Sequence, residues 1–195
     1  MKHIAFTLFA ALLLTATLPS AAQDATHRYG IKSGIIKLIS STAGVDTPET
    51  QYFDDYGAKE SIVYTTDIPG VVKYDNWVIT IGNTMYGVSV TEDKRNYGKP
   101  SENPVPDLTF NNPSPEVAAK YNIKEVGEEK FLGRNCKIFT YETTQRRTTI
   151  THKVWIYKGV ILKQQSKIRN RDVLIYATDF QENVAIPAYA FQIKD

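Results

Sequence analysis

The sequence contains few of the residues from which most catalytic and metal sites are built. Its 195 residues include one cysteine, Cys136, and three histidines. One cysteine cannot form an internal disulfide, and isolated histidines such as His27 and His152 do not make a zinc site. The sequence holds no phosphate-binding glycine loop, no nucleophile elbow and no zinc-protease helix motif. We therefore expect no catalytic residues, no metal and no cofactor, and a protein that is not an enzyme.

Long apolar runs are almost absent. The one such run spans 4–18, follows Lys2 and His3, and ends before the small residues Ser20, Ala21 and Ala22. This pattern predicts a signal peptide at 1–22 and export to the periplasm or beyond. No second run could span a membrane, and no cysteine near the predicted cut indicates a lipid anchor. The sequence then predicts a single domain at 23–195.

Segments long enough for crossover helices are also missing. About ten runs rich in β-branched and aromatic residues follow one another between Gly, Asn and Asp breaks: 28–40, 49–53, 58–66, 76–82, 84–90, 128–133, 135–143, 147–157, 159–168 and 171–180. Short connections favour antiparallel pairing. Gly82-Asn83 and Tyr157-Lys158-Gly159 resemble hairpin turns. The fold class predicted is mainly β, a curved antiparallel sheet in the form of a half-barrel.

One long irregular segment interrupts the strands. Residues 91–115 hold five of the nine prolines. Ser114-Pro115 is a plausible N-cap and first helical position, which predicts a short helix at 115–121. Long loops of this kind serve as lids in some domains and as simple connectors in others. We expect this proline-rich segment to cover part of the sheet.

The stretch YFDDYG, 52–57, raises the question of a metal-binding carboxylate pair. It contains the Y-x-D-D letters of reverse transcriptases, in which paired carboxylates bind metal ions. Here Asp54 and Asp55 lie between two predicted strands, with Gly57 at the end, and this is ordinary turn chemistry. A short, exported chain does not suit a polymerase, so the pattern favours a turn.

The overall charge of +2 conceals a strongly basic segment at 130–171. Between Lys130 and Arg171 there are eleven basic residues and one acidic residue, Glu142. If the strands stay extended, side-chain alternation places most of these cations on one outer face. The predicted anionic-partner surface consists of Arg147, Lys153, Lys163, Lys167, Arg169 and Arg171. A solvated sheet face is the alternative interpretation, while lipid headgroups or an acidic protein are the partners that a functional face would suit. Nucleic acid is excluded as a partner by the export signal.

Motifs in the second half resemble the periplasmic LolA-like group, the outer-membrane lipoprotein carrier and its relatives. The matching positions are Gly127, Glu129, Gly133, Cys136 and Phe139 in one strand pair, Trp155, Ile156, Gly159, Leu162 and Lys163 in a hairpin, and Asp179, Asn183 and Phe191 at the end. The resemblance covers about 120–195 and implies a half-barrel that carries an apolar ligand in the cell envelope. The chain departs from the carrier in offering one short helix where the carrier has several.

Alternation along the strands gives a predicted lining for an apolar cavity. It consists of Ile62, Tyr64, Trp77, Ile79, Ile81, Met85, Ile138, Ile150, Val154, Ile156 and Leu162. Such a wall would hold a lipid or acyl chain by dry burial without directional chemistry. For each residue, ordinary core packing is the alternative. Two further hypotheses are a protein-interaction module that uses the basic face or a strand edge, and an enzyme with scattered carboxylates.

Overall fold

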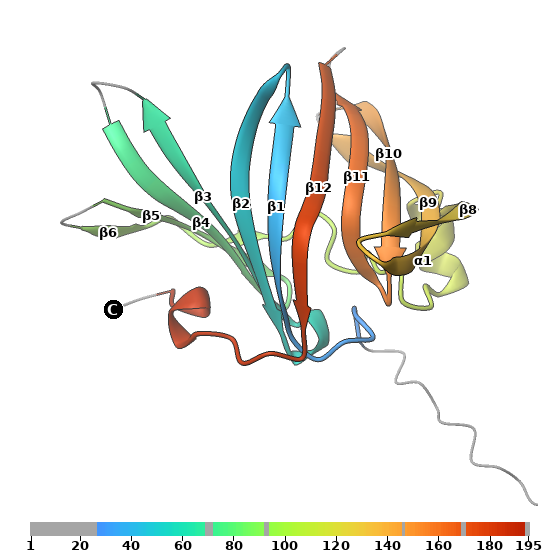
Figure 1. The fold of residues 1–195 in the computed structure, drawn as a ribbon, viewed down its shortest axis with the longest axis horizontal. Helices are drawn as coiled ribbons and strands as arrows, with labels where there is room; N and C mark the ends of the chain where they lie inside the picture. The colour runs from blue at the N-terminus through green and yellow to red at the C-terminus, as the bar shows by residue number, and fades with distance from the viewer. Residues whose placement is uncertain (1–26, 69–71, 92–93, 146, 169–170, 194–195) are drawn as a thin grey trace, which may run out of the picture.

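One curved antiparallel sheet forms the body of the protein (Figure 1). The computed structural model describes residues 27–68, 72–91, 94–145, 147–168 and 171–193. The predicted signal peptide and Arg169 lie outside these ranges. The strands are β1 Gly34–Thr42, β2 Val45–Asp54, β3 Lys59–Ile68, β4 Val72–Ile81, β5 Thr84–Val90, β6 Arg95–Tyr97, β7 Ser101–Glu102, β8 Lys124–Phe131, β9 Arg134–Gln145, β10 Thr148–Tyr157, β11 Val160–Ile168 and β12 Arg171–Glu182. The helices are α1 Pro115–Lys120 and the 3₁₀ turns η1 Asp55–Gly57 and η2 Ala188–Phe191.

The order of strands follows the chain on each side of a central pair. β1 pairs with β12, β2 to β6 extend the sheet on one side, and β11 to β8 extend it on the other. β7 makes a separate pair with β5. The sheet does not close into a barrel. This confirms the predicted class: mainly β, antiparallel and curved, with one short α-helix.

The predicted turns and helix are also confirmed. β4 ends at Ile81 and β5 begins at Thr84, while β10 ends at Tyr157 and β11 begins at Val160. The Ser114 hydroxyl accepts a hydrogen bond from Val117 N and caps α1. The proline-rich segment is less irregular than expected, because it contains β6 and β7.

The start of the predicted first strand is wrong. Residues 27–33, here called the N-terminal segment, do not pair with a strand; β1 begins only at Gly34. Their backbone bonds go to loops instead: Tyr29 N donates to Tyr56 O, and Gly30 N donates to Lys158 O. Because loops supply these partners, the segment lies across the ends of two hairpins.

The two faces of the sheet have different coverings. Directly opposite residues in an antiparallel pair point to the same side. The first face, called the cover face, carries the row Val154, Gln164, Ile175, Ser40 and Thr47 and continues through Leu38, Glu49, Tyr64 and Asn76. Residues 103–123, the cover segment, pack on it over β9 and β10. The opposite side, called the tail face, contacts the tail segment, 184–193, through Tyr52 and Trp77.

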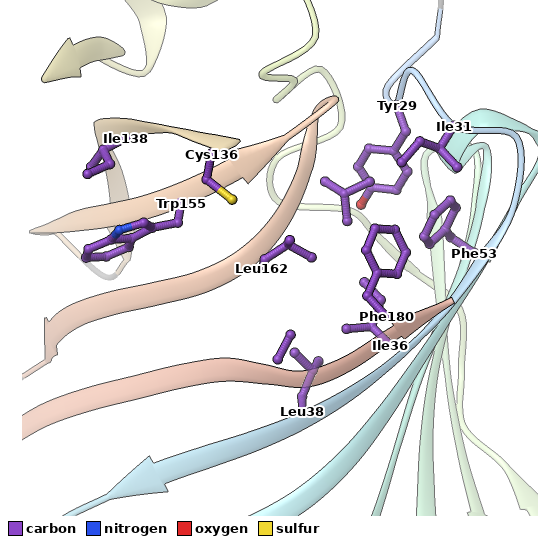
Figure 2. Packing of buried hydrophobic residues seen from close by; sticks show 12 residues of the cluster. Tyr29, Ile31, Ile36, Leu38, Phe53, Cys136, Ile138, Trp155, Leu162 and Phe180 are labelled. Carbon is purple, nitrogen blue, oxygen red and sulfur yellow. The ribbon is translucent and has the colours of Figure 1, made fainter. Parts of the chain in front are cut away.

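Two clusters of buried apolar side chains hold the fold together. The first lies around Tyr29, Phe53, Leu162 and Phe180, which point toward one another from the N-terminal segment, β2, β11 and β12 (Figure 2). The second joins Leu108 and Phe110 of the cover segment to the cover face of β9 and β10. With one buried free cysteine, Cys136, the stability of the domain depends on this packing.

Candidate ligand-binding site

A cavity of about 530 Å³ lies between the cover segment and the turns at the ends of β2 and β4. This volume is within the range of small-molecule sites. The lining combines polar and apolar groups: His27, Arg28, Asp55, Tyr56, Gly57, Ala58, Gly82, Asn83, Pro106, Asp107, Leu108, Thr109, Asn112, Ser114 and Val117. The cavity therefore suits a ligand with both a polar and an apolar part.

The YFDDYG turn forms one wall of this cavity. The Asp54 carboxylate accepts a hydrogen bond from Asp55 N at 2.8 Å, as a turn-capping side chain does. Asp55 and Tyr56 both have left-handed backbones, with φ of 51° and 55°. This conformation is uncommon for Asp and a real outlier for a bulky residue such as Tyr, and such strain often marks functional sites. The stretch is a turn, as predicted, and its strained part faces the cavity.

The N-terminal segment holds this turn in place. Tyr56 N donates to Lys32 O, and the His27 ring stacks on the Tyr56 ring at 4.1 Å with an interplanar angle of 3°. Together with the bond from Tyr29 N, these contacts fix the turn from one side. The strained conformation is thus maintained by its neighbours rather than by its own sequence.

A partly buried ion pair lies behind the cavity wall. Arg28 Nη1 lies 3.2 Å from Glu60 Oε1. Glu60 Oε1 makes no hydrogen bond within the described part of the chain, so this ionic contact is what compensates its burial. Burial works to lower the pKa of Arg28, but the attraction of Glu60, with that of nearby tyrosines, raises it overall. Burial, and then Glu60, raise the pKa of Tyr29 well above its usual value, so Tyr29 stays a neutral hydroxyl.

The cover segment is attached at its two ends. Asn103 N donates to Asn83 O, while Thr109 Oγ1 and Asn111 Nδ2 donate to carbonyl groups of the N-terminal segment. At the far end Glu142 N donates to Tyr121 O, and within the segment the Lys120 ammonium lies 2.9 Å from the Asp107 carboxylate. The Tyr121 hydroxyl, followed by Lys120, lowers the pKa of Asp107 by hydrogen bonding to its ionised form. Asp107 therefore stays ionised and links the loop to α1.

Leu108 and Val117 connect the cavity to the second apolar cluster. Both line the cavity, Leu108 is also a buried member of the cluster, and Val117 packs against it. The cluster covers Val154 and Ile156 on β10. The cavity and the covered apolar wall are thus separated only by side chains of the cover segment at this point.

The structure divides the predicted cavity lining between two faces. Ile62, Tyr64, Met85, Ile150, Val154 and Ile156 lie on the cover face, Trp77, Ile79, Ile81 and Ile138 lie on the tail face, and Leu162 lies at a bulge in β11. None of these eleven lines the cavity described above. Val154 and Ile156 are covered by Leu108 and Phe110, and Ile79 and Leu162 are fully buried in the protein's own packing.

The sequence reasoning missed most of the cavity residues, because they come from loops. Arg28 was assigned to the predicted strand at 28–40, His27 was considered only as a zinc ligand, and Leu108 and Val117 carry no periodic signal. The one indication was the expectation that the proline-rich segment would cover the sheet.

The predicted basic surface is also divided. Lys153 lies opposite Gln165, so Lys153, Lys163 and Lys167 share the tail face. Arg171 points to the other side, because it pairs with Ile168 rather than with Lys167. The strand ends at Ile168 and β12 begins at Arg171, so the assumed continuous parity does not hold. Arg147 lies in the β9–β10 turn with φ of 68°.

Two of these lysines share one aromatic ring. The Nζ atoms of Lys153 and Lys163 lie 5.1 and 4.2 Å from the centroid of the Trp155 ring. The Trp155 indole N–H donates to the Glu129 carboxylate at 2.7 Å. The lysines are therefore held near the sheet by cation–π contacts, while Lys167 is exposed.

His152 is buried in a polar cluster on the cover face. Its Nδ1 lies 2.7 Å from Ser166 Oγ and its Nε2 lies 2.8 Å from Thr143 Oγ1. The ring stacks on Tyr141 at 4.5 Å, and Gln164 Nε2 lies 3.4 Å from Nδ1. All of these neighbours are neutral, and burial lowers the pKa of His152. This is the geometry of a hydrogen-bonded core histidine.

This burial predicts a loss of stability in mild acid. The free energy of unfolding should be insensitive to His152 above about pH 6.5, its unfolded pKa, and should fall as the pH drops from there toward the lowered folded pKa. One proton contributes a slope of at most about 1.4 kcal/mol per pH unit. Urea unfolding between pH 7 and 5 checks this, with His152→Gln as the comparison. An equally steep decline in the variant would show that other groups cause it.

Metal-binding side chains do not cluster in the described part of the chain. No group of three or more His, Cys, Asp or Glu side chains in this part of the chain could hold a metal ion. No helix within the same ranges is long and apolar enough to cross a membrane.

No protein-family model and no curated protein matches the sequence. Among solved structures, the chain is similar to the MucA/MucB complex of Pseudomonas aeruginosa, with 13% identity and a TM-score of 0.49, over 82% of this chain and 55% of that one. It is also similar to an outer membrane lipoprotein-sorting protein domain from Vibrio parahaemolyticus, with 10% identity and a TM-score of 0.39, over 82% and 89%. LprF from Mycobacterium bovis gives 10% identity and a TM-score of 0.43, over 83% and 90%.

The chain thus spans about half the length of the matched chain in the MucA/MucB complex. The three similar proteins have LolA-like folds. At these identities and TM-scores, the similarity assigns neither a ligand nor a partner, and membership of the LolA-like group stays a prediction from the sequence.

Proposed function

We propose that the protein is a non-enzymatic binding protein of the cell envelope that holds an apolar ligand, a lipid or acyl chain, between its sheet and the cover segment. The observation that carries this proposal is the cavity of about 530 Å³ next to the covered apolar wall. Leu108 and Val117 belong to both, so a small outward shift of the cover segment would join them. The apolar wall of Phe139, Val154 and Ile156 would then receive the chain of the ligand.

Side chains of the cover segment occupy the place on the apolar wall that we propose for the ligand. Leu108 and Phe110 bury the wall when no ligand is bound. An entering chain replaces one apolar covering by another, so its net gain is less than the ~0.8 kcal/mol per methylene of full burial from water. After the costs of association, we expect micromolar affinity for a long chain.

The polar mouth of the cavity would take the head of the ligand. Arg28 is paired with Glu60, and Asp107 is paired with Lys120. Because these charges are matched in pairs, the mouth is left with the Asp55 carboxylate and with hydrogen-bonding groups such as the Asn83 side chain. An uncharged or weakly charged polar head suits this arrangement.

Delipidated protein titrated with a fluorescent long-chain fatty acid tests the proposal. We expect saturable binding in the micromolar range, and native mass spectrometry of protein purified from its own envelope should show a co-purified lipid. Binding should weaken as the chain of the probe is shortened. No saturable binding by folded, delipidated protein would contradict the proposed function.

Attachment to an anionic partner, a membrane surface or an acidic protein, through the tail-face lysines is the second candidate, favoured by the exposed Lys153 beside Trp155 and the exposed Lys167 on the same face. We expect the protein to float with anionic vesicles at low salt and to be released at 0.5 M salt, since ~1 kcal/mol per surface lysine is screened. A Lys153→Gln/Lys167→Gln variant should bind less, and a Lys94→Gln/Lys99→Gln control with the same net charge should not. Equal loss in both variants would indicate a simple effect of net charge.

A further inference from the structure

The tail segment packs against the tail face, and the patch that it covers, here called the groove, lies away from the proposed ligand site. After β12 the chain turns back: Asn183 N donates to Ser33 O, and the Ser33 hydroxyl donates to Val184 O. Figure 1 shows η2, in red, beside the half of the sheet formed by β2 to β6 and far from α1. There the Tyr189 ring meets Trp77 edge-on at 5.8 Å and Tyr52 at 6.3 Å. Ala190 is fully buried.

The groove contains polar atoms that the tail segment does not satisfy. In the described part of the chain, four buried side-chain polar atoms have no hydrogen-bond partner. One, in Glu60, has an ionic partner. The other three are Ser61 Oγ, Trp77 Nε1 and Arg95 Nε, on β3, β4 and β6. Registers place all three side chains on the tail face. Buried donors without partners are rare, and an occupant that supplied acceptors would be favoured.

The charge of Arg95 indicates which acceptor is missing. Its guanidinium lies over the Trp77 ring at 5.5 Å, and its Nη1 donates to Gln192 Oε1 at 2.8 Å. The Gln192 amide oxygen accepts one hydrogen bond from the Arg95 guanidinium, whereas a carboxylate could accept two parallel hydrogen bonds from it. Asp75, which lies in the same row of the sheet, accepts instead from the Thr65 hydroxyl at 2.6 Å. The groove therefore presents an apolar and aromatic floor with a cation bound to a neutral partner.

From these contacts we propose that the groove formed by Tyr52, Ser61, Trp77, Ile79 and Arg95 is a docking site for a short segment of a partner protein that adopts the same 3₁₀ turn as η2, and that the tail segment is its resident competitor. The partner segment carries an aromatic residue, which takes the place of Tyr189, and an Asp or Glu three positions later, which takes the place of Gln192. Its carboxylate pairs with Arg95, and its backbone carbonyls face the unpartnered donors. The site lies on the opposite face from the ligand cavity and is independent of the proposed function.

A peptide competition with the full-length protein tests this proposal. Two labelled peptides are used, the tail sequence VAIPAYAFQIKD and the same peptide with Gln192→Glu. The attached tail competes at an effective concentration in the millimolar range, so binding to the wild type should be weak. The acidic peptide should bind at least about tenfold more tightly than the native one, and this preference should disappear in an Arg95→Gln protein. Hydrogen exchange of 184–193 should increase when the acidic peptide binds.

Changes in the attached tail provide the matched controls. Tyr189→Ala should loosen the tail and strengthen peptide binding, while Gln192→Glu in the full-length chain should raise Tm and weaken peptide binding. Gln192→Ala replaces Tyr189→Ala if that variant does not fold. The proposal is overturned if neither loosened variant binds the acidic peptide, if both peptides bind equally, or if peptide binding leaves the tail amides protected.

Discussion

A Val117→Glu variant should bind a fluorescent fatty acid at least about tenfold more weakly than the wild type, a loss of ~1.4 kcal/mol. Val117 lines the cavity and packs against the second apolar cluster. A carboxylate at this position would lie beside the chain of the ligand and would have to be buried or neutralised there. Equilibrium titration of delipidated protein measures the change.

The substitution is chosen so that the fold survives it. Ser114 caps α1 by accepting a hydrogen bond from the backbone N–H of Val117, and this bond does not depend on the side chain at that position. The matched control is Val126→Glu on β8, where the valine side chain is 53% exposed. The control should bind the probe like the wild type. Equal affinities for the two variants would place the ligand elsewhere and remove the main support for the proposed function.

Local sequence signals predicted the strands and turns well. Short runs between Gly, Asn and Asp breaks gave the hairpins at Gly82-Asn83 and Lys158-Gly159, because turn chemistry is decided within a few residues. The capping serine and Pro115 gave α1 for the same reason. The error at 28–33 arose because its apolar residues, Tyr29 and Ile31, are buried by loops and β2 rather than by strand pairing.

The face of the sheet to which each residue points was harder to predict, because it depends on the register between strands. Within β4, alternation correctly groups Trp77, Ile79 and Ile81. The pair Tyr64↔Asn76, however, places Asn76 and Val78 with Tyr64 and sends Trp77 to the opposite face. Trp77 of this set packs against Tyr189 of the tail segment, a covering that strand patterns do not reveal. When both faces of a sheet are covered, apolar residues occur at both odd and even positions of its strands. Alternation alone therefore cannot identify the face that binds a ligand.

The candidate site could not be predicted from the sequence, for a related reason. Its walls come from the N-terminal segment, two turns and the cover segment, which are far apart in the chain and meet only in the fold. YFDDYG was recognised as a turn from its letters. Its consecutive left-handed residues, Asp55 and Tyr56, are imposed by contacts with His27, Tyr29 and Lys32, which no local pattern encodes.

Replacing Gly159 with alanine should reduce the free energy of unfolding by about 2–4 kcal/mol, whereas Gly133→Ala should cost only about 1–2 kcal/mol. The two glycines occupy equivalent two-residue turns, with φ of 83° after Lys158 and 73° after Leu132. Alanine pays a similar conformational cost of ~1–2 kcal/mol in both. They differ in their surroundings. A methyl group at Gly133 would meet nothing within 4 Å, but at Gly159 it would lie 2.8 Å from Arg28 O and 2.9 Å from Asn111 Cβ.

The difference between the stability losses of the two variants therefore measures the contact of the β10–β11 turn with the N-terminal and cover segments. Overpacking of such a contact costs ~1–3 kcal/mol. Urea unfolding of both variants measures it. If the segments move away to relieve the clash, Arg28 and Asn111 shift, and fatty-acid binding by Gly159→Ala should change while that by Gly133→Ala should not. Equal stability losses would show that the segments do not rest on this turn. The cavity wall that depends on Arg28 would then lack its support from β10 and β11.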